Sequence, residues 1–328
     1  LLTESFPEVN AKSSFSDLSL NWKFESERSQ LLSICGFNNQ NLETFYGVLP
    51  RNYTLNGNHL DVGLVVDVMT NTALRGQGLF VRSGLEAIKR LEKTNVKTVI
   101  GFPIRKEVLP GHLKVGWNVQ LTMPIYVCPV GSAQNKRFNH RLISAFAKIL
   151  RVTSSPLRVS KSQISEIAVS ELLEDQNLLN FFSAGTEQKL IQIDKSKEFL
   201  DWRLNRPGVD YKVFLCSDNS PKSVAIVRKM DLNGFQTIAL LDFCSEGTKW
   251  TRAMIRHLMD YAKNQKVDFL AISTNPTNAK RLKILQTGFV RSHKKFKVIT
   301  RSIGHGLNTF TQSDESSFRM TWLDSDTV

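Results

Sequence analysis

The chain has 328 residues, a mass of 37.2 kDa, 41% hydrophobic residues and a net charge of +13 at pH 7, enough for one large domain or two ordinary ones. The dispersed positive charge suits an anionic ligand such as a nucleotide or coenzyme A better than nucleic acid. No apolar run approaches the roughly 20 residues of a membrane helix. The four cysteines show no spacing typical of a metal site or a disulfide framework. We therefore expect a cytoplasmic protein with reduced thiols, no membrane span and no metal; because the first residue is Leu1, a preceding targeting segment stays open.

The first half of the chain predicts alternating strands and helices. Strand patterns occupy residues 42–48, 59–69, 96–102 and 119–127. Helical spacing occupies residues 79–94, 110–117 and 139–150. Asn56-Gly57-Asn58 predicts a turn between the first two strands, and Pro103 ends the third strand.

The second half predicts the same order of elements without repeating the sequence. Helices are expected at 197–204, 249–263 and 277–286, and strands at 211–216, 223–230, 235–244, 267–273, 295–301 and 317–323. A polar stretch at residues 153–165 separates the halves. We interpret the chain as two tandem copies of one α+β unit, residues 1–160 and 161–328.

The most informative stretch is the strand, turn and helix start between Asp67 and Phe80. The strand at residues 59–69 leads into Arg75-Gly76-Gln77-Gly78, and a helical pattern follows. Two glycines let backbone N–H groups converge, and a helix N-terminus adds the positive end of its dipole. The stretch therefore predicts a cradle for a diphosphate, such as that of coenzyme A. In the second half, Cys244-Ser245-Glu246-Gly247-Thr248 stands in its place.

These residues resemble the GNAT superfamily of acyl-CoA-dependent N-acyltransferases. Its signature, an Arg or Gln, two variable residues, Gly, one variable residue and Gly or Ala, is matched by residues 75–80, except that Phe80 replaces the final small residue. Gly101-Phe102-Pro103 and the stretch at 199–203 (Phe-Leu-Asp-Trp-Arg) resemble segments of tandem GNAT proteins. The resemblance implies two modules, each a central, mostly antiparallel sheet flanked by helices, with only the first binding acyl-CoA.

The resemblance also implies how the co-substrate is held. It assigns coenzyme A binding to Val68, Met69, Thr70, Arg75, Gly76, Gln77, Gly78, Leu79 and Phe80. The first three would line the pantetheine arm, the N–H groups of the others would hold the pyrophosphate, and the N–H of Met69 or Thr70 would stabilise the oxyanion.

Two side chains are candidate proton carriers for amide formation. Asp67 stands in an apolar strand two residues before Met69, and burial would raise its pKa toward a base role. His112 opens the short helix at 110–117 and titrates near neutrality when unperturbed. The alternatives are a loop-anchoring carboxylate for Asp67, a helix-cap histidine for His112, and a chain of waters as the proton path. No cysteine lies near the turn, which favours direct attack of the amine on the thioester.

The acceptor is less defined by the sequence. Trp117 and Trp202 could stack on a base or sugar, and Arg203 could contact a diphosphate, although core packing is the default for each. The overall layout resembles bacterial N-acyltransferases that place an acyl group such as 3-hydroxybutyryl on a dTDP-linked 3-amino-3,6-dideoxyhexose for surface polysaccharide, acting as monomers or homodimers. The alternatives are an aminoacyl-tRNA- or acetyl-CoA-dependent transferase acting on a peptide or protein amine, and a non-catalytic coenzyme A-binding protein.

Overall fold

The computed structural model describes residues 17–24, 32–130, 163–184, 189–304 and 309–325. The strands are β1 (Leu32–Asn38), β2 (Asn41–Leu55), β3 (Asn58–Thr70), β4 (Thr98–Gly101), β5 (Asn118–Pro129), β6 (Ile164–Ile167), β7 (Gln192–Ile193), β8 (Tyr211–Ser217), β9 (Pro221–Leu232), β10 (Phe235–Ser245), β11 (Phe269–Ser273) and β12 (Val290–Ser302). The α-helices are α3 (Asp17–Phe24), α4 (Leu79–Leu91), α5 (Leu109–Lys114), α7 (Val169–Glu174), α8 (Gln176–Ala184), α9 (Lys197–Leu204), α10 (Thr248–Asn264), α11 (Pro276–Arg281) and α12 (Thr309–Gln312). The 3-10 turns are η1 (Thr72–Leu74), η2 (Lys106–Val108), η4 (Ile284–Thr287), η5 (Glu315–Ser317) and η6 (Trp322–Asp324). This composition confirms the mixed α+β class.

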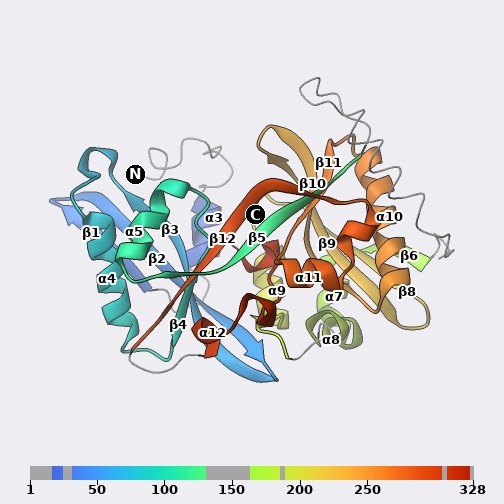
Figure 1. Cartoon of the computed structure of the whole chain (residues 1–328), viewed down its shortest axis with the longest axis horizontal. Coiled ribbons are helices and arrows are strands. Elements are labelled where there is room, and N and C mark those ends of the chain that lie inside the picture. The colour runs from blue at the N-terminus through green and yellow to red at the C-terminus, as the bar shows by residue number, and fades with distance from the viewer. Residues whose placement is uncertain (1–16, 25–31, 131–162, 185–188, 305–308, 326–328) are drawn as a thin grey trace.

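The described strands form one sheet that runs through both halves of the chain. Their order is β1-β2-β3-β4-β12-β5-β11-β10-β9-β8-β6, with β7 pairing to β2. Thus β12, from the end of the chain, lies between β4 and β5 of the first half, and Figure 1 shows β5 and β12 crossing the middle of the molecule together. Their pairing satisfies the backbone groups of both halves, so no open sheet edge is left where they meet. The boundary predicted near residue 160 lies outside the described residues.

Two parallel strand pairs, each connected by a helix, stand in this otherwise antiparallel sheet. In the first half β3 and β4 pair from Val62↔Thr98 to Val65↔Gly101, with α4 between them in sequence. In the second half β10 and β11 pair from Thr237↔Phe269 to Leu240↔Ile272, with α10 between them. Both pairings cover four residues, after which the strands separate. Each half of the chain therefore contains one parallel strand pair whose strands are connected by a helix.

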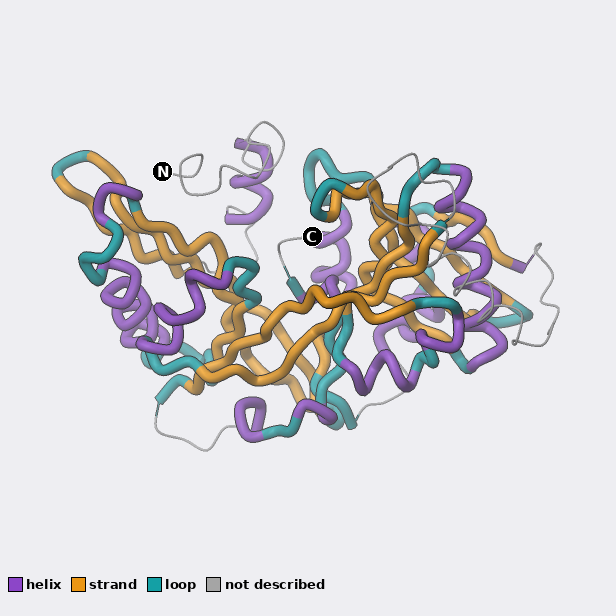
Figure 2. Tube along the Cα trace, turned by 45° about the horizontal axis from the view of Figure 1, so that its top comes forward, coloured by secondary structure: helices purple, strands orange, loops and turns teal. Residues whose placement is uncertain are grey.

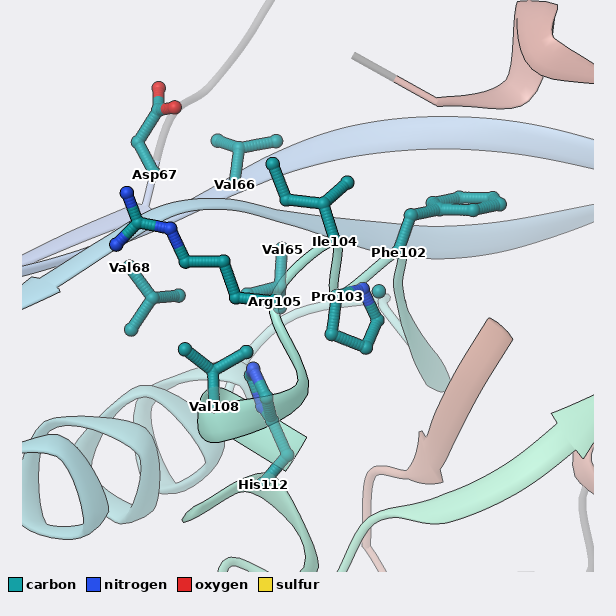
Figure 3. A pocket seen from close by; sticks show the side chains of 11 residues that line it. Val65, Val66, Asp67, Val68, Phe102, Pro103, Ile104, Arg105, Val108 and His112 are labelled. Atoms are coloured by element: carbon teal, nitrogen blue, oxygen red, sulfur yellow. The ribbon is translucent and has the colours of Figure 1, made fainter. Parts of the chain in front are cut away.

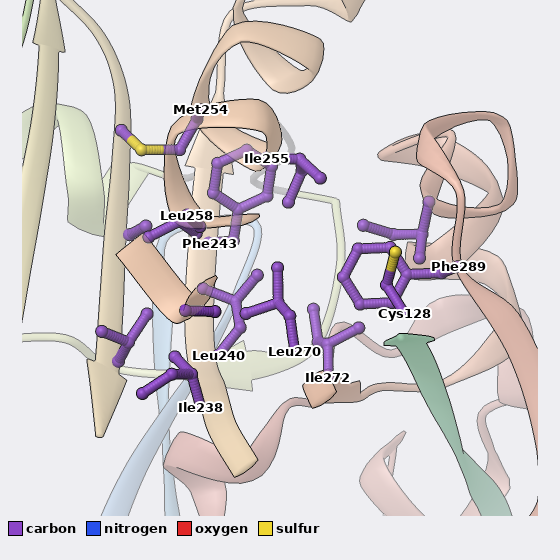
Figure 4. Packing of buried hydrophobic residues seen from close by; sticks show 14 of the residues in the cluster. Cys128, Ile238, Leu240, Phe243, Met254, Ile255, Leu258, Leu270, Ile272 and Phe289 are labelled. Carbon is purple, nitrogen blue, oxygen red and sulfur yellow. The ribbon is translucent and has the colours of Figure 1, made fainter. Parts of the chain in front are cut away.

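The alternating side chains of β3 divide the first half into two cores. Val65 faces the core under α4, which includes Tyr46, Ala87 and Trp117. Val62, Leu64 and Val66 face the opposite core, against which Phe24 of α3 packs. In the second half, Met254, Ile255 and Leu258 of α10 cover Leu240 and Ile272 of the sheet, and Cys128 of β5 joins them (Figure 4). Helices α3 and α4 therefore lie on opposite faces of β3, which matters for the site.

Several predicted elements are wrong in extent. The strand predicted at 42–48 continues to Leu55 in β2, and the strand predicted at 295–301 begins at Val290 in β12. Residues 317–323 do not form a strand; they contain the end of η5, the start of η6 and two isolated bridges, Ile191↔Phe318 and Thr274↔Thr321. The helix predicted at 277–286 ends at Arg281, because Lys283 takes the left-handed conformation (φ 52°) before η4. The helix predicted at 139–150 lies outside the described residues.

The cysteines are free thiols, with Cys35 exposed and the other three buried. In the parts of the chain that the structure describes, no group of three or more His, Cys, Asp or Glu side chains is arranged to hold a metal ion. The same parts contain no helix with the length and apolarity needed to cross a bilayer.

Candidate functional site

The site is a gap that opens where β3 and β4 separate. The parallel ladder ends at Val65↔Gly101, while β3 continues along β2 to Thr70. Pro103 follows β4 and has no N–H to extend a ladder, so the chain turns away into η2. Among the described strands, none pairs with the β4 side of β3 beyond Val65.

A β-bulge in β3 shapes this edge. Met69 opposes Phe45 and Val66 opposes Gly47, so Asp67 and Val68 together face the single residue Tyr46. Asp67 has φ 50°, in the left-handed region that Asp tolerates better than most residues. A bulge re-aims the peptide groups of its strand, and bulges of this kind are frequent beside active sites.

A pocket of about 100 Å³ occupies the gap (Figure 3). It is lined by Val65, Val66, Asp67, Val68, Gly101, Phe102, Pro103, Ile104, Arg105, Val108 and His112. Most of the lining is apolar, and Arg105 extends its side chain across the pocket toward Asp67 and Val68 (Figure 3). An apolar cavity with a few convergent polar groups is typical of a small-molecule site.

The predicted glycine turn connects this gap to α4. Gly76 (φ 84°) and Gly78 (φ 81°) are both in the left-handed region, and a Cβ at either position would meet nothing within 4 Å. In the described part of the chain, the N–H groups of Gly76, Gly78, Leu79 and Phe80 make no hydrogen bond. Open N–H donors at the start of a helix, here the 13-residue α4, are groups to which anions commonly bind. Asn71, at the start of the segment that leads into the turn, is held in place because its side-chain amide donates a hydrogen bond to the Glu43 carboxylate at 2.5 Å.

Thr70 lies between the pocket and the turn. Its hydroxyl is buried and has no hydrogen-bond partner among the described residues. The neighbouring Met69 carbonyl accepts a bond from the Thr44 hydroxyl at 2.9 Å, which holds this end of β3 in place. Val68, Met69 and Thr70 thus form the stretch of β3 between the pocket and the glycine turn.

His112 forms part of the pocket wall on the α4 side. It is 5% exposed, and its ring packs edge-on against Phe80 and Trp117 at centroid distances of 4.9 and 5.2 Å. Burial lowers its pKa to about 4, so the imidazole is neutral at pH 7. A group with so low a pKa accepts a proton poorly at neutral pH, whereas it can still hydrogen-bond a ligand.

Asp67 is ion-paired with a residue that the sequence analysis did not single out. The Nζ of Lys23, in α3, lies 2.6 Å from Asp67 Oδ2, and the two side chains are 12% and 14% exposed. A carboxylate in this pair can act as a base only if the lysine is displaced from it. The structure therefore couples the pocket to α3 on the opposite face of β3.

Helix α3 is anchored to α9 by two stacked indoles. Trp22 and Trp202 stack at 4.6 Å, and each Nε1–H donates to the other's backbone carbonyl, at 2.6 and 3.1 Å. Arg51 lies over Trp202 at 4.0 Å and Arg206 over Trp22 at 5.4 Å. These stacked rings and the cations on either side of them hold α3, from the first half of the chain, against α9, from the second half.

A short repeat connects Lys23 to the second half of the chain. Residues 20–24 read Leu-Asn-Trp-Lys-Phe, and residues 200–204 read Leu-Asp-Trp-Arg-Leu. Trp22 and Trp202 occupy the same position in the two segments and make the same hydrogen bond to each other, so Lys23 corresponds to Arg203. This repeat is the signal that could have identified Lys23 from the sequence.

The three predicted acceptor residues do not line the pocket. Trp117 is 2% exposed and belongs to the core under α4, where it touches His112. Trp202 is engaged in the stack with Trp22. Arg203 is 1% exposed and donates to the Tyr211 hydroxyl at 2.7 Å and to the Ser325 carbonyl at 3.2 Å. Packing is the role that the structure gives to these side chains.

The equivalent gap in the second half is filled by the protein itself. Asp242, like Asp67, stands two residues after the last parallel pair, beside a bulge. Its carboxylate bonds Lys195 at 2.6 Å and Arg319 at 2.8 Å, and all three side chains are fully buried. The backbone next to Arg319 bonds the chain just after β11, where Thr274 donates to the Met320 carbonyl at 2.6 Å. Segment 318–321 therefore occupies the place that remains open in the first half.

No protein-family model matches this chain, and no curated protein matches it. Solved structures do match. A GCN5-related N-acetyltransferase from Anabaena variabilis has a TM-score of 0.61 at 11% identity, over 92% of this chain and 69% of its own. An Enterococcus faecalis protein described as a probable N-acyltransferase has a TM-score of 0.64 at 13% identity, over 92% and 68%. N-myristoyltransferase of Saccharomyces cerevisiae with bound myristoyl-CoA has a TM-score of 0.56 at 11% identity, over 91% and 74%. The chain has the fold of GNAT-type N-acyltransferases.

Proposed function

We propose that this protein is an acyl-CoA-dependent N-acyltransferase with one co-substrate site, in the first half of the chain. The observation that carries the proposal is the open β3–β4 gap joined to an open glycine turn, while the matching gap of the second half is closed by Arg319 and Asp242. A pyrophosphate would bind the open N–H groups of Gly76, Gly78, Leu79 and Phe80. The N–H groups of Arg75 and Gln77, which the resemblance also assigned to the pyrophosphate, donate instead to the Thr72 and Leu74 carbonyls. Pantetheine would lie along Val68, Met69 and Thr70, and the thioester would reach the pocket.

The chemistry that follows is amide formation by direct attack. An amine that enters the gap attacks the thioester carbonyl, and the backbone N–H groups at the end of β3 stabilise the oxyanion. His112, neutral and buried, forms the wall and can donate or accept one hydrogen bond to the co-substrate. Residues 1–160 would bind acyl-CoA, and residues 161–328 would shape the acceptor side.

For the acceptor we propose the amine of a nucleotide-linked amino sugar, such as a dTDP-3-amino-3,6-dideoxyhexose of a surface-polysaccharide pathway. The net charge of +13 suits its diphosphate, and the resemblance of the sequence layout supports the class. Thiol release from a panel of acyl-CoAs mixed with dTDP- and UDP-linked amino sugars, with product masses recorded, tests this assignment. Coenzyme A binding without thiol release in the presence of any of these sugars would indicate that the acceptor is a peptide, protein or tRNA amine.

Replacing Asp67 by asparagine is expected to lower kcat by about 100-fold if its carboxylate receives the proton of the amine, because general bases contribute on the order of 100-fold or more. The dissociation constant for coenzyme A should stay unchanged, since the turn is untouched. Steady-state thiol release and isothermal titration measure the two quantities.

The matched variant is Lys23→Met, which removes the same ion pair from the other side and leaves the carboxylate in place. It should keep kcat within about threefold of the parent, well short of the loss expected for a missing base. Equal losses in Asp67→Asn and Lys23→Met would show that the pair only anchors α3 and that Asp67 is not the base.

A further inference from the structure

The amine of Lys23 is held on the side of the thioester site that faces away from the cofactor turn. The turn and α4 cover one face of β3, whose core includes Val65 and Trp117. Helix α3 covers the other face, where Phe24 packs against the core that includes Val66. Figure 2 shows α3 standing over the sheet on the side away from α4. An acceptor reaching the thioester from the face opposite the turn must arrive where α3 lies.

The position of the Lys23 amine is fixed by its ion pair and by the residues on either side of it. Its Nζ lies 2.6 Å from Asp67, which itself lines the pocket, and the lysine side chain is 12% exposed. The preceding residue, Trp22, is clamped by the stack and the two reciprocal hydrogen bonds to Trp202. The following residue, Phe24, packs edge-on against Phe45 at 5.7 Å. A primary amine held next to a bound thioester has a high effective concentration.

We propose that Lys23 is a self-acylation site, at which the protein transfers one acyl group from bound acyl-CoA to its own Nζ. The inference rests on the proposed acyl-CoA site. The Lys23 ammonium first gives one proton to Asp67. The neutral nitrogen then attacks the thioester carbonyl carbon, the new C–N bond forms and the C–S bond breaks. Coenzyme A leaves as the thiol. The two ammonium protons lost by Lys23 go to the departing thiolate and, through Asp67, to solvent.

Acylation removes the charge of Lys23 and with it the ion pair to Asp67. The Asp67 carboxylate then loses this ion pair, and α3 loses one of its anchors while keeping the Trp22–Trp202 stack. Self-acylation in the first turnover would thus change the charge on the acceptor side of the site before later turnovers. In the second half of the chain the equivalent position is Arg203, whose guanidinium stays protonated and cannot be acylated in this way.

The test uses the full chain with acetyl-CoA as the probe and peptide mass spectrometry as the readout. Lys222 is the internal control, because it also pairs with a carboxylate, Glu246, at 2.8 Å but lies far from the pocket in the sheet order. We expect Lys23 to be acetylated at least about tenfold faster than Lys222, to one group per chain, at a rate independent of protein concentration. Lys23→Arg should lose this modification, and Trp22→Ala, which loosens α3, should slow it.

Acetylation of Lys23 no faster than of Lys222, or at a rate that rises with protein concentration, would overturn the inference. Coenzyme A binding, measured by titration on the same sample, separates the two claims. Binding and turnover on added amines with Lys23 unmodified would remove self-acylation alone. Absence of binding would remove the proposed function together with it.

Discussion

Coenzyme A binding is expected to weaken at least tenfold when Gly78 is replaced by valine. Gly78 caps α4 with φ 81°, which costs a side-chain-bearing residue roughly 1–2 kcal/mol. A side chain there would also extend into the open space at the helix start, where a Cβ now meets nothing within 4 Å and where the pyrophosphate would sit. A tenfold change corresponds to about 1.4 kcal/mol of binding free energy and is measurable by isothermal titration.

Gly57→Val is the matched control for this experiment. Gly57 has φ 79° in the turn between β2 and β3, and a Cβ there also meets nothing within 4 Å. Backbone strain should therefore lower the stability of both variants similarly, while only the Gly78 variant should lose coenzyme A binding. Equal affinities in the two variants would show that the turn does not hold the ligand.

Replacing Asp242 by asparagine is expected to lower the free energy of unfolding by about 3–5 kcal/mol, as measured by urea denaturation. The carboxylate is fully buried between Lys195 and Arg319. Burial opposes its ionisation, but the charges of Arg319 and Lys195 outweigh burial, and the net pKa of Asp242 is lowered. The variant would leave Lys195 and Arg319 buried without the negative charge that pairs with them. Most of the expected loss of stability is therefore the cost of burying these two unpaired charges.

Glu246→Gln supplies the comparison on the surface. Glu246 pairs with Lys222 at 2.8 Å, with side chains that are 41% and 20% exposed. Solvent screens such a pair, so its removal should cost less than about 1 kcal/mol. A loss of similar size in both variants would mean that the buried cluster does not hold segment 318–321 in the second gap.

The glycine turn and most of the elements could be predicted because their signals are local. Two glycines at the start of an amphipathic pattern require left-handed conformations and a helix start, and the structure has both at Gly76, Gly78 and Leu79. Helix α9 occupies the predicted range, residues 197–204. The order of strand, turn, helix and strand in each half follows from the periodicity of apolar residues, which depends on neighbours a few positions away.

The amino-acid sequence by itself thus determined the mixed α+β order of elements and the glycine turn before α4, while the assignment of coenzyme A to residues 68–80 stays a prediction. Only the tertiary structure decided that β12 lies between β4 and β5, that Lys23 pairs with Asp67 across 44 positions, and that segment 318–321 closes the second gap. Each of these brings together segments far apart in the chain. Their pairing depends on how whole strands and cores pack, and local periodicity carries no information about which distant segment fills an opening.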